Sequence, residues 1–352
     1  MVTLQALFGL VVFIGIAVLF SEQRRMLNWQ LLAAGLGLQF LVAFVMFRFE
    51  LLQALLNALN QVVVAIADAT ETGSLFLFGY LGGDPSNVAY PFSIDNPEAT
   101  VILAFRILPL ILIFTVLSAI LWHFRILPLI VRGFSVVLRR AMGVSGAVGF
   151  SAAANIFIGM VESPALIRPY IKGLTRSELF VVMSCGMATI AGTVMVLYSV
   201  ILGEVIDNAL GHILTASVIS APAAIMLALI MVPATPKDSE KIAGGDAVDI
   251  STDYHNVMDA IVRGTSDGLK LMVNVGAMLL VFIALVALFN SALLLVPYSS
   301  NDPLTLQTIL GWMFAPLVWL MGIPWQEAQL AGTLMGIKTA LNELLAFLAL
   351  VD

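Results

Sequence analysis

The most constraining feature of the chain is a series of apolar stretches long enough to cross a lipid bilayer, which takes about 20 helical residues. Only 11% of the 352 residues are charged, 61% are hydrophobic, and the mean hydropathy is +1.03. Soluble domains carry about 25% charged residues, so a soluble globule is excluded. The sequence predicts an all-α, multi-spanning membrane protein with full crossings at Val2–Phe20, Trp29–Phe47, Val101–Trp122, Ser177–Leu202, His212–Val232 and Gly268–Leu295.

Several classes of protein are excluded by what the chain lacks. No cation precedes the first stretch and no small-x-small cleavage site follows it, so we expect a retained span rather than a signal peptide. The single cysteine, Cys185, allows no disulfide framework and no Cys-based metal site. A net charge of −6 gives no basic footprint for nucleic acid. No organic cofactor is expected.

The cationic residues are distributed unevenly between the two sides of the membrane. When the six crossings alternate, the segments near 21–28, 123–176 and 233–270 share one side and contain thirteen of the sixteen Lys and Arg residues. The opposite segments, 68–98, 203–211 and 296–303, hold acidic residues but no Lys or Arg. The positive-inside rule then predicts a multi-pass protein of the cytoplasmic (inner) membrane with its N-terminus outside.

Between the crossings lie apolar segments that are shorter or interrupted: Leu51–Ala67, Ile126–Arg140, Gly143–Tyr170, Leu304–Leu320 and Trp325–Leu350. Residues 126–170 and 304–350 echo each other, each with a Pro-containing amphipathic helix, a Met-Gly-(Val/Ile) marker and a small-residue helix. The first copy starts inside and the second outside. This pattern predicts an inverted-repeat transporter with broken helices.

Three of these regions predict helix breaks inside the membrane. Gly143–Tyr170 begins and ends on the cationic side, which predicts a re-entrant hairpin with its tip at 159–164, where Gly and Pro interrupt the helix. Trp325–Leu350 is expected to turn similarly within 336–343. Residues 185–193 carry two Gly and two Thr at mid-depth of a span, so this span is a candidate for unwinding.

Ionisable residues within the membrane are costly and are functional candidates by default. Glu162 and Glu343 each lie at an expected hairpin break. The alternative for each is a structural carboxylate that caps backbone N–H groups or pairs with Lys338 or Arg168. Lys338 and Asn342 are four residues apart on one helical face, which favours a brace for the hairpin over substrate contact.

Oxygen ligands for a small cation are the second kind of candidate. Asn155 lies in a small, apolar run, where its amide must find partners, and taken alone it favours a hydrogen bond between helices. Together with Thr189 and with carbonyls freed at the breaks, it could supply hard oxygen ligands. Intramembrane enzymes fit worse, because there is no His-Glu-x-x-His, no complete Gly-x-Ser-x-Gly and no Gly-x-Gly-Asp. We therefore expect no enzyme.

Several strings resemble the concentrative nucleoside transporter family over nearly the whole chain and in the same order. The most specific runs from Gly336 to Glu343, which has the family's Gly-x-Lys-x-x-x-Asn-Glu pattern. The other strings are 154–170, 177–183, 186–194 and 267–270.

The resemblance implies a homotrimer of cation-coupled nucleoside importers, each with a scaffold and a moving transport domain that carries two hairpins and two broken helices. It divides the chain into scaffold helices at 1–124, a first transport repeat at 125–232, a cytoplasmic loop and scaffold span at 233–296, and an incomplete second transport repeat at 297–352. The partners it implies are a nucleoside, the lipid bilayer and further copies of the chain.

By position, the resemblance also assigns roles to individual residues. Glu162, with Met160 and Val161 beside it, would bind the nucleobase side, and Val194 would line the base pocket. Glu343, in the same hairpin as Asn342, would accept hydrogen bonds from ribose hydroxyls. Sodium would be held by Asn155, Thr189 and backbone carbonyls such as that of Ile158.

The chain departs from the family pattern at two points. Many relatives have Gly-Gln-Thr-Glu at the first hairpin, whereas this chain has apolar Met160 and Val161 there, so base selectivity does not carry over. The family's last two helices, one with an Asn-Phe-Ser-Ser-type ribose motif, are not found before Asp352. Proton coupling through Glu343 or Glu162, and a fragment that does not transport, therefore stay as alternatives to sodium-coupled import.

Overall fold

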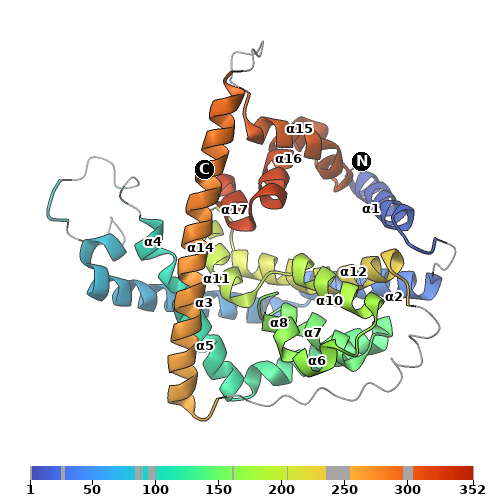
Figure 1. Cartoon of the computed structure of the whole chain (residues 1–352), viewed down its shortest axis with the longest axis horizontal. Helices are drawn as coiled ribbons and strands as arrows, with labels where there is room; N and C mark the ends of the chain where they lie inside the picture. The colour runs from blue at the N-terminus through green and yellow to red at the C-terminus, as the bar shows by residue number, and fades with distance from the viewer. Residues whose placement is uncertain are drawn as a thin grey trace. The chain divides into compact units, whose positions relative to one another are not determined.

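The computed structural model describes residues 2–24, 28–83, 88, 90–93, 100, 102–160, 162–203, 205–234, 254–295 and 304–351. All regular elements in these ranges are helical, which confirms the all-α prediction (Figure 1). The helices are α1 (Val2–Leu19), α2 (Trp29–Arg48), α3 (Glu50–Phe78), the 3-10 turn η1 (Gly79–Gly82), α4 (Leu103–Arg106), α5 (Pro109–His123), α6 (Ile126–Met142), α7 (Gly146–Asn155), α8 (Glu162–Leu166), α9 (Arg168–Ile171), α10 (Arg176–Ala188), α11 (Gly192–Leu202), α12 (Ala209–Met231), α14 (Val257–Leu293), α15 (Leu306–Leu320), α16 (Trp325–Ala340) and α17 (Glu343–Val351).

Six helical segments of the described residues are long and apolar enough to cross a membrane: Trp29–Arg48, Glu50–Gly82, Leu103–His123, Arg176–Leu202, Ala209–Met231 and Val257–Leu293. Five of them correspond to crossings expected from the sequence. The sixth, which contains α3, was not expected as a crossing. The expected first crossing, Val2–Phe20, corresponds to α1, which is apolar but shorter than these six.

The prediction that the apolar segment at Leu51–Ala67 is short was wrong, because α3 is one continuous helix of 29 residues. Polar residues lower the mean hydropathy of this segment, but their spacing is that of a continuous helix. They recur every three to four residues, so they lie on one face of a helix; the members of this stripe are Gln53, Asn57, Asn60, Gln61, Asp68, Glu71 and Thr72. The buried residues of α3, Leu56, Val63, Thr70 and Ser74, follow a separate helical stripe.

The helices form two compact units. The large unit contains residues 20–272, and the small unit contains residues 1–19 and 273–352. The boundary between them falls after α1 and again within α14.

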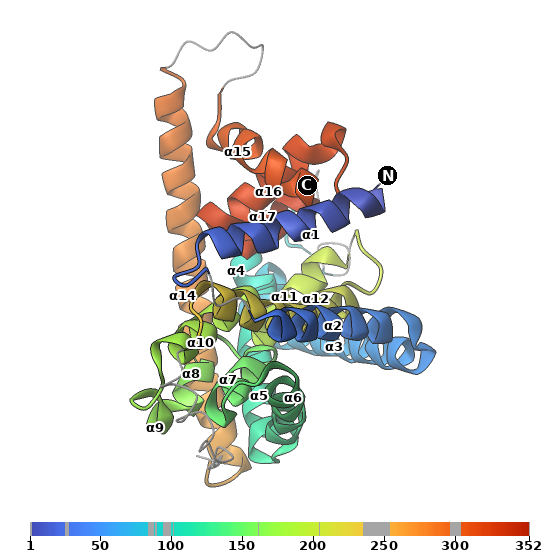
Figure 2. The ribbon, with the colours of Figure 1, turned by 90° about the vertical axis from the view of Figure 1, so that its right-hand side faces the viewer.

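In the small unit, glycines let helices approach closely. α15 and α16 lie against each other with a bend of 117° between their axes (Figure 2). A Cβ at Gly332 would lie 2.6 Å from the carbonyl oxygen of Gly311, and one at Gly336 would lie 2.4 Å from the Leu310 Cβ. Small residues four apart are a common device for close helix packing in membranes. α1 joins this pair, since the Gln5 side chain donates to the carbonyls of Trp319 and Ile323.

The large unit uses the same device where α14 meets α5. A Cβ at Gly264 or at Gly268 would lie 2.9 Å from a Cα atom of α5, that of Val116 or of Leu112. These glycines are also four residues apart. Elsewhere in this unit α7 packs against both α6 and α10, and α12 packs against α2, α10 and α11.

The internal echo found in the sequence has a counterpart in the backbone. In each copy a Pro-containing helix, α6 or α15, ends at a Met-Gly pair and is followed by a small-residue helix, α7 or α16. Gly143 has φ +66° and Gly322 has φ +105°, a region open mainly to glycine. Both copies therefore turn at the same point of their sequence by the same backbone device.

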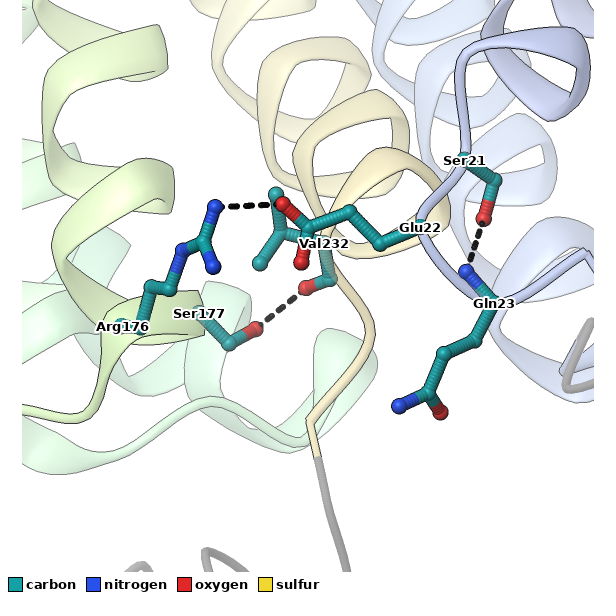
Figure 3. Close-up of polar contacts among 6 residues, drawn as sticks. All are labelled: Ser21, Glu22, Gln23, Arg176, Ser177 and Val232. Atoms are coloured by element: carbon teal, nitrogen blue, oxygen red, sulfur yellow. Dashed lines mark hydrogen bonds and ion pairs between the residues drawn. The ribbon is translucent and has the colours of Figure 1, made fainter.

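One end of the large unit is tied by contacts between three segments (Figure 3). The Glu22 amide donates to the Met231 carbonyl at 2.9 Å, and the Ser177 hydroxyl donates to the Val232 carbonyl at 2.6 Å. Arg176 also pairs with Glu22 at 2.5 Å, but both side chains are well exposed, so this ion pair contributes less than about 1 kcal/mol. The Ser177 hydroxyl fixes the start of α10 beside the end of α12, and the Glu22 amide ties the segment after α1 to the same end of α12.

Candidate functional site

Hairpin 1 consists of the helical arms α7 and α8 and the turn between them, which is described over residues 156–160. The first arm is a Gly- and Ala-rich run whose ten residues are all buried. Its helix ends where the amides of Phe157 and Ile158 both donate to the Ala154 carbonyl, at 2.9 and 2.8 Å. Of the tip expected at 159–164, Gly159 lies in the break between the arms. The prediction that Pro164 breaks the helix there was wrong, because Pro164 lies within α8.

The tip of hairpin 1 is anchored by apolar side chains. Ile156, which is 1% exposed, packs with Val218 and Ala221 of α12. The Phe157 ring meets that of Phe134 from α6 edge to face, with centroids 5.6 Å apart. These contacts hold the polar groups of the turn in a fixed place within the large unit.

The expected unwound span is confirmed, because α10 ends at Ala188 and α11 begins at Gly192. In the break, the Ile190 amide donates to the Ser217 hydroxyl of α12 at 3.3 Å, and the Gly192 amide donates to the Phe157 carbonyl at 3.2 Å. The carbonyls of Gly186 and Ala188, which would accept these amides in a continuous helix, are released. The break therefore contacts the tip of hairpin 1 and presents carbonyl oxygens.

Asn155 and Thr189 come together at this point. The Thr189 hydroxyl lies 3.2 Å from the Asn155 carbonyl and 2.9 Å from the Cys185 carbonyl. The Asn155 side chain is 1% exposed, and within the described part of the chain its amide oxygen and nitrogen have no hydrogen-bond partner. A buried amide without partners costs about 1–3 kcal/mol. This unpaired side chain marks a place where an oxygen-seeking ligand would be stabilised.

The residues proposed for the nucleobase side lie at or near the same turn. Met160 is 61% exposed, and its Cβ would lie 3.1 Å from a Cβ at Gly186 of α10. Val194 is half-buried in the first turn of α11. Val161 and the side chain of Glu162 lie outside the described residues, and the Glu162 backbone begins α8. Ile158 is half-buried in the turn.

Hairpin 2 consists of α16, α17 and the two residues between them, Leu341 and Asn342, in the small unit. Glu343 begins α17 and is half-buried, and the charge of Lys338 acts on it. The Asn342 side-chain oxygen accepts the Leu345 amide at 2.8 Å, so it caps α17. The structure thus places Lys338, Asn342 and Glu343 around one turn, with the Asn342 oxygen already engaged.

Sequence reasoning missed three polar residues in the large unit that hold the site together. Ser151 and Ser163 link the two arms of hairpin 1, and Ser217 binds the amide of Ile190 in the break. In the sequence each of these serines is only a hydroxyl within an apolar run. That pattern does not show which group the hydroxyl binds.

Models of three protein families match the chain in order along its length. They are described as Na+ dependent nucleoside transporter N-terminus at residues 8–81, nucleoside recognition (Gate) at 104–205, and Na+ dependent nucleoside transporter C-terminus at 212–352. The nucleoside permease NupC of Helicobacter pylori is 32% identical over 99% of this chain and 80% of its own length. The chain belongs to the concentrative nucleoside transporter family.

Other members of the family show the same extent of likeness. An uncharacterized transporter of Bacillus subtilis, YutK, is 35% identical over 98% of this chain and 81% of its own length. The solved structure of CNTnw in an inward-facing substrate-bound state is 34% identical, with a TM-score of 0.86, covering 100% of this chain and 80% of that one. Since these relatives are transporters, the family assignment also confirms the expectation that the protein is not an enzyme.

Proposed function

We propose that this member of the concentrative nucleoside transporter family imports nucleosides into the cell together with sodium ions by an elevator-type movement. The observation that carries the sodium part is the buried, unpaired side chain of Asn155 beside Thr189. The substrate class is supported by the family.

A sodium ion suits the chemistry at the break between α10 and α11. Hard cations prefer neutral and charged oxygen ligands, and this region offers the Asn155 amide oxygen, the Thr189 hydroxyl and released carbonyls. The carbonyl of Ile158, in the adjacent turn, is a further proposed ligand. A sodium ion bound there would give the Asn155 oxygen a partner. Ion binding would therefore remove the free-energy cost of a buried, unpaired polar group.

Coupling requires that the cation favour the state that binds substrate. Hairpin 1 supplies a route for this, since Asn155 ends α7 and the turn that follows it carries Met160 and leads into Glu162. We assign Glu162, Met160, Val161 and Val194 to the nucleobase side, and Glu343 with Asn342 to the ribose hydroxyls. A charged acceptor makes stronger hydrogen bonds to hydroxyls than a neutral one.

The assembly and orientation are part of the same proposal. We propose a homotrimer in the cytoplasmic membrane with the N-terminus outside. The support for this orientation is the segregation of Lys and Arg residues, which holds when α1 crosses the membrane and α3 does not. The continuous polar stripe of α3 fits a helix that lies along the membrane surface.

Uptake into proteoliposomes tests the proposal most directly. Labelled uridine and adenosine are supplied with sodium outside, and then with choline in place of sodium at the same pH. We expect uptake to need sodium. Uptake that is undiminished in choline but follows an imposed proton gradient would contradict sodium coupling and support proton coupling. Absence of nucleoside binding by the purified chain would instead contradict the transport function itself.

A further inference from the structure

A pair of serine hydroxyls joins the two arms of hairpin 1. Ser151 of α7 and Ser163 of α8 are both 0% exposed. Their Oγ atoms lie 2.9 Å apart, and the Ser163 hydroxyl donates to the Ser151 carbonyl at 2.7 Å. Because the Ser163 proton is used on that carbonyl, the Ser151 hydroxyl donates in the bond between the two Oγ atoms, and both protons are satisfied. We call this pair the serine clamp.

The serine clamp closes a loop that contains the groups proposed for both ligands. Asn155 lies four residues after Ser151, on the same face of α7. Glu162 directly precedes Ser163. The proposed cation ligand and the proposed substrate carboxylate are therefore each within one helical turn of the clamp, on opposite arms.

The far side of this loop is fixed to the broken span. The Asn155 carbonyl accepts the Thr189 hydroxyl, and the Phe157 carbonyl accepts the Gly192 amide. Within the loop, the Ser163 amide donates to the Gly159 carbonyl at 3.0 Å. With the far side held by the break and the near side by the clamp, the two arms have one fixed separation.

We propose that Ser151 and Ser163 are positioning residues that transmit cation binding to the substrate carboxylate. The proposal rests on the function proposed above. When the cation binds Asn155 it fixes the first arm, and the clamp passes this constraint to the second arm, which carries Glu162. Coupling between two ligands is reciprocal, so loosening the clamp reduces the effect of sodium on nucleoside affinity and that of nucleoside on sodium affinity by the same factor.

The hydrogen bonds predict a graded series of variants. Ser163→Ala removes both clamp bonds, whereas Ser151→Ala removes the bond between the Oγ atoms and leaves the one to the Ser151 carbonyl. Ser163→Cys keeps a similar shape but makes only weak hydrogen bonds. A matched control is Ser199→Ala in α11, since Ser199 is 4% exposed and its hydroxyl bonds only within its own helix, to the Val196 carbonyl.

The experiment measures binding of labelled uridine and adenosine to the purified full chain in lipid nanodiscs, without sodium and with saturating sodium. The ratio of the two dissociation constants is the coupling factor. We expect Ser163→Ala and Ser163→Cys to lower this factor about tenfold, Ser151→Ala to lower it less, and Ser199→Ala to leave it unchanged. A loss of stability alone would reduce the amount of active protein without changing the factor.

The outcomes separate the two proposals. If the unaltered protein binds nucleoside with no effect of sodium, sodium coupling is wrong and the clamp proposal falls with it. If sodium acts on the unaltered protein and the Ser163 variants keep the same coupling factor as Ser199→Ala, only the clamp proposal is overturned. If Ser163→Ala does not fold, the coupling factors of Ser151→Ala and Ser163→Cys are compared with that of Ser199→Ala instead.

Discussion

The two hairpins each reverse the chain between two helices, but they do so by different means. Hairpin 1 has arms of ten and five residues and a wider turn, described over residues 156–160. It is held by side-chain hydrogen bonds and by the break between α10 and α11. Hairpin 2 has arms of sixteen and nine residues with only Leu341 and Asn342 between them, and it is held by a helix cap and by glycine contacts with α15.

The difference is the basis for assigning the proposed ion site to hairpin 1 rather than to hairpin 2. The wide turn of hairpin 1 leaves backbone carbonyls and the Asn155 amide without helical partners, which suits a cation. In the tight turn of hairpin 2, the Asn342 side-chain oxygen is used to cap α17. The same turn places Lys338 near Glu343, and this charged pair suits the binding of hydroxyl groups. The following predictions test this division, from the largest expected effect to the smallest.

Glu343→Gln should abolish nucleoside uptake with expression intact, a loss of about 100-fold, because hydrogen bonds to a charged acceptor are worth about 1.5–3 kcal/mol. The measurement is initial uptake in proteoliposomes at saturating sodium. Glu327→Gln is the control, since Glu327 is an exposed carboxylate in the first turn of α16. A normal rate for Glu343→Gln would overturn the assignment of hairpin 2 to the ribose.

Gly192→Ala should disconnect hairpin 1 from the broken span. Its Cβ would lie 2.4 Å from the Phe157 carbonyl oxygen, so the backbones must separate. Overpacking of this kind costs about 1–3 kcal/mol, and we expect a lower melting temperature together with weaker sodium dependence. Gly133→Ala in α6 is the matched control, because a Cβ there meets nothing within 4 Å. Equal stability of the two variants would contradict this contact.

Asn155→Ala should raise the sodium concentration for half-maximal uptake about tenfold, since it removes one oxygen ligand from a buried site. The nucleoside KM at saturating sodium should change much less. Asn57→Ala, which removes an exposed amide from α3, serves as the control. If Asn155→Ala changed the nucleoside KM alone, the division between the hairpins would be wrong.

Asn342→Ala should cost about 1 kcal/mol of stability through loss of the α17 cap. Because the Asn342 oxygen already accepts the Leu345 amide, we expect only a few-fold effect on the nucleoside KM. Asn342→Asp, which retains a capping oxygen, should recover most of the stability in a thermal melt. A loss of uptake as large as that of Glu343→Gln would show that Asn342 itself contacts substrate.

The parts of the fold that depend on local chemistry could be predicted from the sequence. The break after Asn155 and the break at 189–191 contain the Gly and Thr residues that indicated them, and the apolar stretches located most of the long helices. The continuation of α3 past Ala67 was missed because the polar residues after it lower the hydropathy. On one face of a helix they can remain exposed while Thr70 and Ser74 are buried.

The proximity of the candidate residues Asn155 and Thr189 could be anticipated from the sequence, but the contacts that support them could not. Asn155 and Thr189 stand out because polar groups in apolar segments need partners. The serine clamp does not, because it pairs residues across a turn whose width the sequence does not define. The same holds for Gly192 and Phe157, where the need for glycine is visible only once the two backbones are seen in contact.

The shortness of the α7 arm has a consequence for how the protein is made. Ten helical residues span about 15 Å, roughly half of the hydrocarbon thickness. As the chain leaves the ribosome, such a segment is too short to be recognised and inserted as an independent span. We therefore expect hairpin 1 to insert only after α10, α11 and α12 have entered the bilayer and offer it a surface. Assembly of the proposed ion site would then be a late event in biogenesis.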